Sequence, residues 1–189
     1  MFDMQHLLLI LKEGGVSADI MKTHRLLRPV SMLAAGLFLG AAARLFDIYF
    51  QNLGEIFSQM AVWILLGTLI AIYSPTRRAA MRNIFPFCMG MLITYYATAM
   101  LTRGVYSWSF IAGWTAFALL SPVMAWFAWM AKERGAFAKV IGAGIVLVSI
   151  LSSVLLFDRL RIYDFIIDGL LVYFLFFRKI DRRGAAGNA

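Results

Sequence analysis

The sequence is poor in the residues from which most metal and thiol sites are built. It has one cysteine, Cys88, and two histidines, His6 and His24, among 189 residues. A single cysteine cannot form a disulfide within the chain, and a thiol among apolar residues acts mainly as a small hydrophobic side chain. Both histidines precede the first long apolar run, where too few other ligands stand to complete a metal site. We therefore expect no metal and no cofactor.

Motifs of common enzyme classes are also missing. The chain contains no Gly-x-Ser-x-Gly, no His-Glu-x-x-His, no paired-cysteine metal motif and no phosphate-binding loop. Asp164 and Asp168 lie one turn apart on a single segment, whereas the two catalytic aspartates of a hydrolase must face each other. The sequence therefore favours a protein that is not an enzyme, with no catalytic residues.

Long polar insertions are absent, and apolar residues dominate instead. Hydrophobic residues make up 62% of the chain and the mean hydropathy is +0.79, against about 45–50% apolar residues in soluble domains. A helix needs about 20 apolar residues to cross a bilayer. Such segments occur at about 30–50, 55–73, 84–102, 108–130, 137–157 and 162–178. Because these runs are continuous, the sequence predicts an all-α, polytopic membrane protein, a six-transmembrane-helix bundle, and not a β-barrel.

The basic residues are distributed unevenly between the predicted loops. A net charge of +8 would suit a nucleic-acid-binding protein. With the N-terminus in the cytoplasm, however, fourteen of the 18 Lys and Arg residues fall in inner segments, and the four outer ones are Arg44, Arg103, Arg159 and Arg161. This is the positive-inside pattern. We expect a multi-pass inner-membrane protein that is embedded in the lipid bilayer, has both termini in the cytoplasm and binds no nucleic acid.

The two ends of the chain differ from the six-span membrane domain at 30–180. Residues 1–29 contain short amphipathic stretches that fit a helix lying in the cytoplasmic headgroup layer. The alternative is a docking surface for another subunit. Residues 181–189 include a Gly-Ala-rich end, and they predict a disordered cytoplasmic tail.

The third predicted span has an unusual polar content. A basic loop, 74–83, precedes the apolar segment in this interpretation. Small or hydroxyl-bearing residues then recur every four positions and share one helical face: Gly90, Thr94, Thr98 and Thr102. Threonine hydroxyls in membrane helices bond to their own backbone without any functional role. Tyr95 and Tyr96 are harder to explain by packing alone.

Charged residues inside the predicted spans are the candidates for a binding site. A charge near the centre of a span costs ~2.5–3.5 kcal/mol, so such residues are functional candidates by default. A rise of ~1.5 Å per residue places Arg44 and Asp168 at one depth in the outer half of a ~30 Å core, where we expect them to pair. A structural ion pair and snorkelling into the interface are the alternatives. The candidate substrate-binding residues are Arg44, Asp47, Tyr95, Tyr96, Thr98 and Asp168.

The first predicted span carries a pair of small residues, Gly36 and Gly40, spaced four apart. Such a pair lets a second helix approach closely, either within the bundle or in a separate subunit. The six-span layout together with Gly36-Leu37-Phe38-Leu39-Gly40 resembles the substrate-binding S components of energy-coupling-factor vitamin transporters. In that family the small-xxx-small motif of the first span has alanines and docks to the coupling subunit, and the substrate pocket opens outward.

This resemblance implies the substrate-binding subunit of a small-solute, vitamin-like importer, with a transporter coupling subunit as its partner. Stretches such as Leu119-Leu120-Ser121-Pro122 are also similar to uncharacterised six-span bacterial membrane proteins. The alternative function is therefore a structural or regulatory six-span membrane protein with no small-molecule substrate, for which a homo-oligomer is the other possible assembly.

Overall fold

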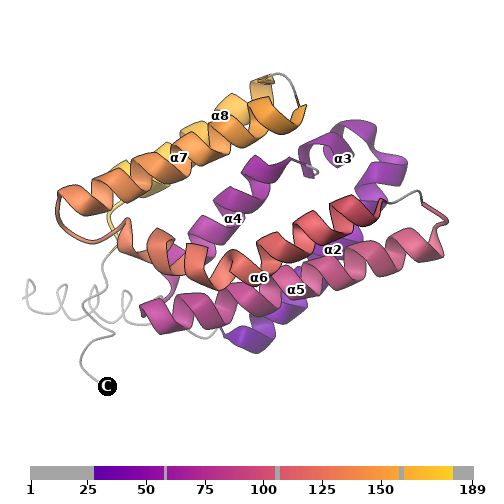
Figure 1. Ribbon diagram of the computed structural model, residues 1–189, viewed down its shortest axis with the longest axis horizontal. Helices are drawn as coiled ribbons and strands as arrows, with labels where there is room; N and C mark the ends of the chain where they lie inside the picture. Colours follow the sequence, from indigo (N-terminus) through magenta and orange to yellow (C-terminus); the bar gives the residue numbers. More distant parts are fainter. Residues whose placement is uncertain (1–27, 58, 105–106, 158–159, 181–189) are drawn as a thin grey trace, which may run out of the picture.

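The computed structural model describes residues 28–57, 59–104, 107–157 and 160–180, so the predicted N-terminal segment up to residue 27 and the tail at 181–189 lie outside the described residues (Figure 1). Within the described ranges the fold is all-α, as predicted, and contains no strand. Its elements are α2 (Pro29–Tyr49), α3 (Gln51–Phe57), α4 (Met60–Tyr73), α5 (Arg77–Leu101), α6 (Trp108–Met130), α7 (Ala136–Phe157), α8 (Ile162–Val172) and the short π-helix η1 (Tyr173–Phe177).

Among the described residues, four helices are long and apolar enough to cross a membrane: α2, α5, α6 and α7. Their outer faces carry large exposed apolar side chains, such as Phe38 on α2 and Leu155 on α7, which are 74% and 75% exposed. Apolar surface of this extent is unfavourable in water and matches the hydrocarbon core of a bilayer. The apolar helices therefore indicate a membrane-embedded protein.

The predicted second and sixth spans are shorter than expected, so the count of six full spans is not confirmed. The expected span 55–73 is interrupted after α3, which leaves only 14 residues in α4. Helix α8 has 11 residues and continues into the 5 residues of η1. At a rise of ~1.5 Å per residue, α4 is about 21 Å long, against a hydrocarbon core of ~30 Å.

Helix α5 begins earlier than predicted. The Oγ1 atom of Thr76 accepts a hydrogen bond from the backbone N–H of Ala79 at 3.1 Å, and the helix starts at Arg77. The basic stretch predicted as a loop is therefore mostly helical. A threonine N-cap followed by good helix formers, arginine and alanine, explains the difference.

Helix α4 lies at the centre of the molecule although it is short. It packs against α5 and α6 on one side and against α7 and α8 on the other (Figure 1). Its sequence is apolar all round, which is typical of a helix that is buried on every face. Ala61, Ala71 and Ile72 are accordingly inaccessible to solvent. The lack of a polar face in the sequence therefore indicates that α4 is a buried helix.

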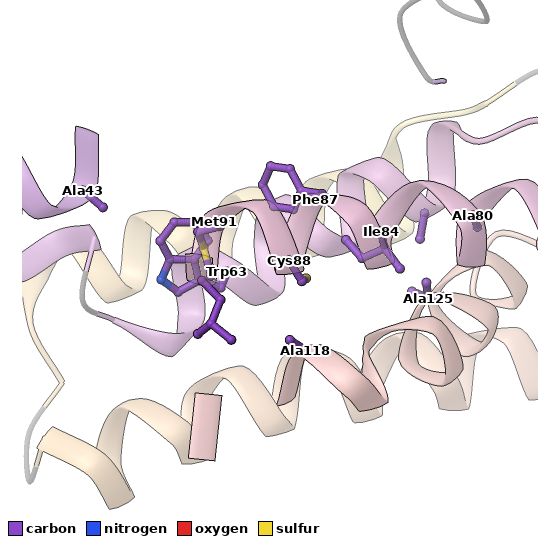
Figure 2. Close-up of a cluster of buried hydrophobic side chains, with 12 residues drawn as sticks. Ala43, Trp63, Ala80, Ile84, Phe87, Cys88, Met91, Ala118 and Ala125 are labelled. Atoms are coloured by element: carbon purple, nitrogen blue, oxygen red, sulfur yellow. The ribbon is translucent and has the colours of Figure 1, made fainter. Parts of the chain in front are cut away.

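A group of buried apolar side chains joins α2, α4, α5 and α6. Figure 2 shows Cys88 of α5 pointing toward Ala118 of α6, with Trp63 of α4 beside Met91. The small alanines of α6 let the two helices approach closely. Cys88 is a free, buried thiol within this core.

Helices α2 and α5 run parallel and in close contact. A Cβ atom added to Gly36 would lie 2.1 Å from the carbonyl oxygen of Phe87, and one added to Gly40 would lie 2.1 Å from that of Met91. On the facing side, a Cβ atom at Gly90 would lie 2.9 Å from the carbonyl oxygen of Leu33. Real Cβ atoms do not approach oxygens so closely, so glycine is required at this contact.

The basic segments of α5, of the α6–α7 turn and of η1 meet at one end of the molecule. Arg77 Nη2 lies 2.5 Å from Glu133 Oε1, which joins the start of α5 to the turn. Lys132 Nζ donates to the backbone carbonyl of Arg178 at 2.6 Å, which joins the same turn to the end of η1. We call this the inner end, and the opposite end, where α2 and α5 finish, the outer end.

Candidate functional site

Two clusters of polar side chains lie at the outer end and are joined by α3. The Arg44 cluster consists of Arg44, Asp47 and Tyr95, and the Gln59 cluster consists of Glu55, Gln59, Arg161 and Tyr163. Helix α3 contacts the first cluster through Gly54, because a Cβ atom at this glycine would lie 2.6 Å from the Cα of Asp47. The next residue, Glu55, contacts the second cluster through Arg161.

In the Arg44 cluster, one carboxylate oxygen serves two partners. The hydroxyl of Tyr95 donates to Asp47 Oδ2 at 2.7 Å, while Arg44 Nη1 lies 3.7 Å from the same oxygen. A distance of 3.7 Å is too long for a strong hydrogen bond. The Arg44 and Asp47 side chains are 17% and 20% exposed, and Arg44 Nε is buried without a hydrogen-bond partner.

The guanidinium of Arg44 also lies against the loop that follows α5. A Cβ atom at Gly104 would lie 2.1 Å from Arg44 Nη2, so this glycine makes room for the arginine. A guanidinium has five N–H donors in a fixed planar fork. Arg44 therefore retains donor capacity that a carboxylate or another planar acceptor fits.

In the Gln59 cluster, a deeply buried amide is only partly satisfied. Gln59 is 1% exposed. Its Nε2 donates to the hydroxyl of Tyr163 at 3.4 Å, while its Oε1 has no hydrogen-bond partner. Arg161 Nη1 binds Glu55 Oε2 at 2.5 Å and also donates to the Tyr163 hydroxyl, but Arg161 Nε is buried and unpaired. The cluster thus holds one unpaired acceptor and one unpaired donor.

The interruption between α3 and α4 explains why Gln59 is buried at depth. Gln59 is the N-cap of α4, whose inner end is fixed by the hydrogen bond from Asn83 Nδ2 of α5 to Ser74 Oγ. Helix α4 rises about 21 Å, so in a ~30 Å core with its inner end at one boundary its outer end would stop some 9 Å short of the far side. The Gln59 amide, whose backbone is extended (φ −74°, ψ 133°), would then lie within the hydrocarbon thickness.

Asp168 belongs to neither cluster. Its Oδ1 accepts a hydrogen bond from Ser149 Oγ of α7 at 2.6 Å. Asp164, one turn earlier, accepts from Ser153 Oγ at 3.4 Å and from the backbone N–H of Arg161 at 2.8 Å. Asp168 is 8% exposed and Asp164 is inaccessible to solvent. Both carboxylates therefore accept hydrogen bonds from serines of α7, and Asp164 also accepts one at the start of α8.

The expected ion pair between Arg44 and Asp168 is not formed. Helix α2 packs mainly against α5 and α3, whereas α8 packs against α4 and α7 (Figure 1). Arg44 instead approaches Asp47, one turn away on its own helix. The depth calculation compared positions along the membrane normal only, and equal depth does not place two residues on neighbouring helices.

The remaining candidates on α5 have supporting positions. The ring of Tyr96 packs edge-to-face against that of Tyr95, with the centroids 5.3 Å apart. The backbone carbonyl of Thr98 accepts a hydrogen bond from Thr102 Oγ1 at 2.8 Å, near the end of α5. The structure thus brings together Arg44, Asp47 and Tyr95, places Tyr96 beside them, and leaves Asp168 apart.

The face of α2 that carries Gly36 and Gly40 is covered by α5 of the same chain. The resemblance to transporter S components assigned this face to a separate coupling subunit. In the structure the contact at Gly36 and Gly40 is made by α5, which is the packing within the bundle that the sequence also allowed.

Sequence reasoning missed the Gln59 cluster, although a signal for it was present. Glu55 and Gln59 are polar residues, four positions apart, within the predicted span 55–73. Two such residues on one face of an apolar segment are expensive in lipid and indicate a functional or structural partner. Tyr163 and Arg161 carry no comparable signal, because they lie at the boundary of the last apolar run.

The described residues contain no group of three or more side chains suited to hold a metal ion. No protein-family model, no curated protein and no solved structure matches the chain. The chemistry of the outer end, two clusters with unpaired donors and an unpaired acceptor, therefore has to be interpreted from its geometry.

Proposed function

We propose that the chain is a six-span inner-membrane protein that binds a small polar solute at its outer end, between the Arg44 and Gln59 clusters. The observation that carries this proposal is the state of Gln59, which is 1% exposed and has an unpaired Oε1 at the interruption between α3 and α4. The proposed role is binding and not catalysis.

The physical argument rests on the cost of such a group in lipid. Irregular backbone at membrane depth is tolerated only where protein buries it or where it lines a water-filled cavity. Transporters often form their substrate sites at interrupted helices of this kind. A buried polar atom without a partner costs about 1–3 kcal/mol, and a solute that supplied the missing hydrogen bonds would remove that cost.

The proposed topology has α2, α3–α4, α5, α6, α7 and α8–η1 as its six spans, with both termini in the cytoplasm. The short spans are compatible with this topology because α4 is enclosed by other helices and does not have to face lipid along its whole length. The gathering of basic segments at the inner end agrees with the positive-inside pattern.

An importer subunit also needs a surface that couples it to its transport partner. Because α5 covers Gly36 and Gly40, the proposed coupling to another subunit uses a different surface from the one that the resemblance implies.

A specific observation favours the rival function, a structural or regulatory protein without a substrate. Asp47, Asp164 and Asp168 each already accept hydrogen bonds from groups of this chain.

Native mass spectrometry of protein extracted directly from membranes tests the proposal. We expect a co-purified small molecule that is lost in Gln59→Met, because this change keeps the side-chain volume and removes the amide. The matched control is Thr102→Val, which removes an exposed hydroxyl at the same end. Retention of the same ligand by Gln59→Met, or its absence from the unmodified protein, would contradict solute binding at this site and favour the structural role.

A further inference from the structure

The lipid-facing side of α5 carries a pattern that solute binding does not explain. Arg78 and Arg82 stand one turn apart near its inner end, and both are exposed. Large apolar side chains continue along the same helical face. They are also exposed, at 39% for Phe85, 56% for Ile93 and 55% for Met100. The face thus has two guanidiniums at one end, followed by an apolar stripe.

Nothing in the described part of the chain balances the charge of these two arginines. No carboxylate oxygen lies within 4 Å of Arg78 or Arg82 there. Glu133 is the acidic residue at the described inner end, and it binds Arg77. The first turn of α5 contains no acidic residue, although the partial positive charge of a helix N-terminus favours one. An external anion would therefore find cations, a helix dipole of the same sign and, among the described residues, no competing carboxylate.

The length of the stripe matches one leaflet of a bilayer. Ile93 follows Arg82 by eleven positions, which correspond to about 16 Å at the α-helical rise, or roughly half of a ~30 Å hydrocarbon core. A phospholipid whose phosphate lies at Arg78 and Arg82 would therefore have its acyl chains beside Phe85 and Ile93. A soluble anion would use only the first half of this surface.

We propose that this surface, the α5 lipid face (Arg78, Arg82, Phe85 and Ile93), binds an anionic phospholipid of the inner leaflet. The two guanidiniums hold the phosphate through charge-assisted hydrogen bonds, and the apolar side chains contact an acyl chain. The inference rests on membrane embedding and is independent of whether the outer end binds a solute.

The test compares lipid retention in mixed vesicles of phosphatidylglycerol and phosphatidylcholine, followed by native mass spectrometry. The unmodified protein is expected to retain phosphatidylglycerol preferentially. The double variant Arg78→Gln/Arg82→Gln is expected to lose about thirtyfold of that preference, since each basic residue near a headgroup contributes about 1 kcal/mol. Arg78→Lys/Arg82→Lys keeps the charges and should keep most of the preference.

The matched control is Arg134→Gln/Lys139→Gln, which removes two exposed inner-end charges outside the α5 lipid face and should change the preference much less. Equal loss in the two glutamine pairs would overturn the proposal in favour of a diffuse attraction. Equal retention of both lipids by the unmodified protein would also overturn it.

Soluble glycerol phosphate should not raise the melting temperature of the protein, and a rise equal to that from phosphatidylglycerol would overturn the proposal in favour of a site for soluble anions. If the glutamine pair does not fold, Arg82→Gln and Arg82→Lys give the same comparison.

Discussion

The hydroxyl of Thr94 on α5 lies 2.8 Å from the backbone carbonyl oxygen of Leu37 on α2. The same hydroxyl lies 2.9 Å from the carbonyl oxygen of Gly90 and 3.4 Å from that of Met91 on its own helix, so a single proton is shared among these acceptors. A hydrogen bond from a side chain to the backbone of another helix requires the two backbones to be close. Glycines at the crossing of α2 and α5 make that approach possible.

Thr94→Val is expected to destabilise the protein by about 1 kcal/mol, because valine keeps the shape of threonine but cannot donate to Leu37. The matched control is Thr102→Val, whose hydroxyl bonds only within the C-terminal turn of α5. Thermal unfolding in detergent measures both. A loss in the control as large as that in Thr94→Val would show that the contact between helices adds nothing beyond the local bond.

Gly40→Ala is expected to lower stability by about 1–3 kcal/mol, since the added methyl group overlaps the Met91 carbonyl oxygen and forces the helices apart. Gly144→Ala on α7 makes the same chemical change where nothing lies within 4 Å. There alanine should be neutral or slightly stabilising, because it has the higher helix propensity. Equal melting temperatures for the two variants would contradict the close packing of α2 and α5.

Helix positions followed from the sequence wherever an apolar run ended at strong turn signals. The span predicted at 108–130 coincides with α6, and the one predicted at 137–157 begins one residue after α7 does. Gly36 and Gly40 likewise indicated a close helix contact, since a bare backbone face has few other uses in a membrane. Averaged hydropathy did not locate the interruption after α3, although Glu55 and Gln59 mark it as individual polar residues.

The partners of the candidate site could not be obtained from the sequence in the same way. Depth along a span follows from residue counting, but lateral position depends on which helices are neighbours. The sequence therefore predicted a pair between Arg44 and Asp168. In the structure Asp168 accepts a hydrogen bond from Ser149, and Arg44 lies near Asp47. Serines on an apolar helix are usually small packing residues, so the sequence alone did not indicate Ser149 as the partner of Asp168.

Double-mutant cycles test whether Arg44 interacts with Asp168 and whether Tyr95 interacts with Asp47. Arg44→Gln and Asp168→Asn are expected to be additive within about 0.5 kcal/mol, because the residues share no partner. Tyr95→Phe and Asp47→Asn should instead show a coupling of about 1 kcal/mol, from the 2.7 Å hydrogen bond between them. Stability in detergent is the measurement. Coupling between Arg44 and Asp168, or additivity between Tyr95 and Asp47, would contradict the arrangement of the outer end.

Lys132 joins the α6–α7 turn to the end of η1. Its ammonium donates to the carbonyl oxygens of Phe174 at 2.9 Å, Leu175 at 3.0 Å and Arg178 at 2.6 Å. The carbonyls at the end of a helix have no partners within it, and a cation there is favourable. Lys132→Met should therefore destabilise η1 by about 2 kcal/mol.

Hydrogen exchange of residues 173–180 measures this local effect, which should appear as faster exchange while the core of α5 is unchanged. Lys139→Met is the control. Lys139 is exposed, and this substitution removes the same charge from the same end of the molecule. Unchanged exchange in Lys132→Met would mean that the three hydrogen bonds do not hold the end of η1 in place.

The orientation of the bundle in the membrane can be tested with single cysteines, because the chain has only Cys88 to remove. In a Cys88→Ala background, Ser109→Cys places a thiol at the exposed start of α6, and Arg134→Cys places one in the exposed inner turn. A membrane-impermeant maleimide should label Ser109→Cys on intact spheroplasts and Arg134→Cys only after lysis. The bond from Lys132 to the Arg178 carbonyl fixes the end of η1 beside this turn, so the label at 134 also reports the side on which η1 ends. Labelling of Arg134→Cys from outside would reverse the orientation, and it would place the basic end against the outer leaflet, contrary to the positive-inside pattern.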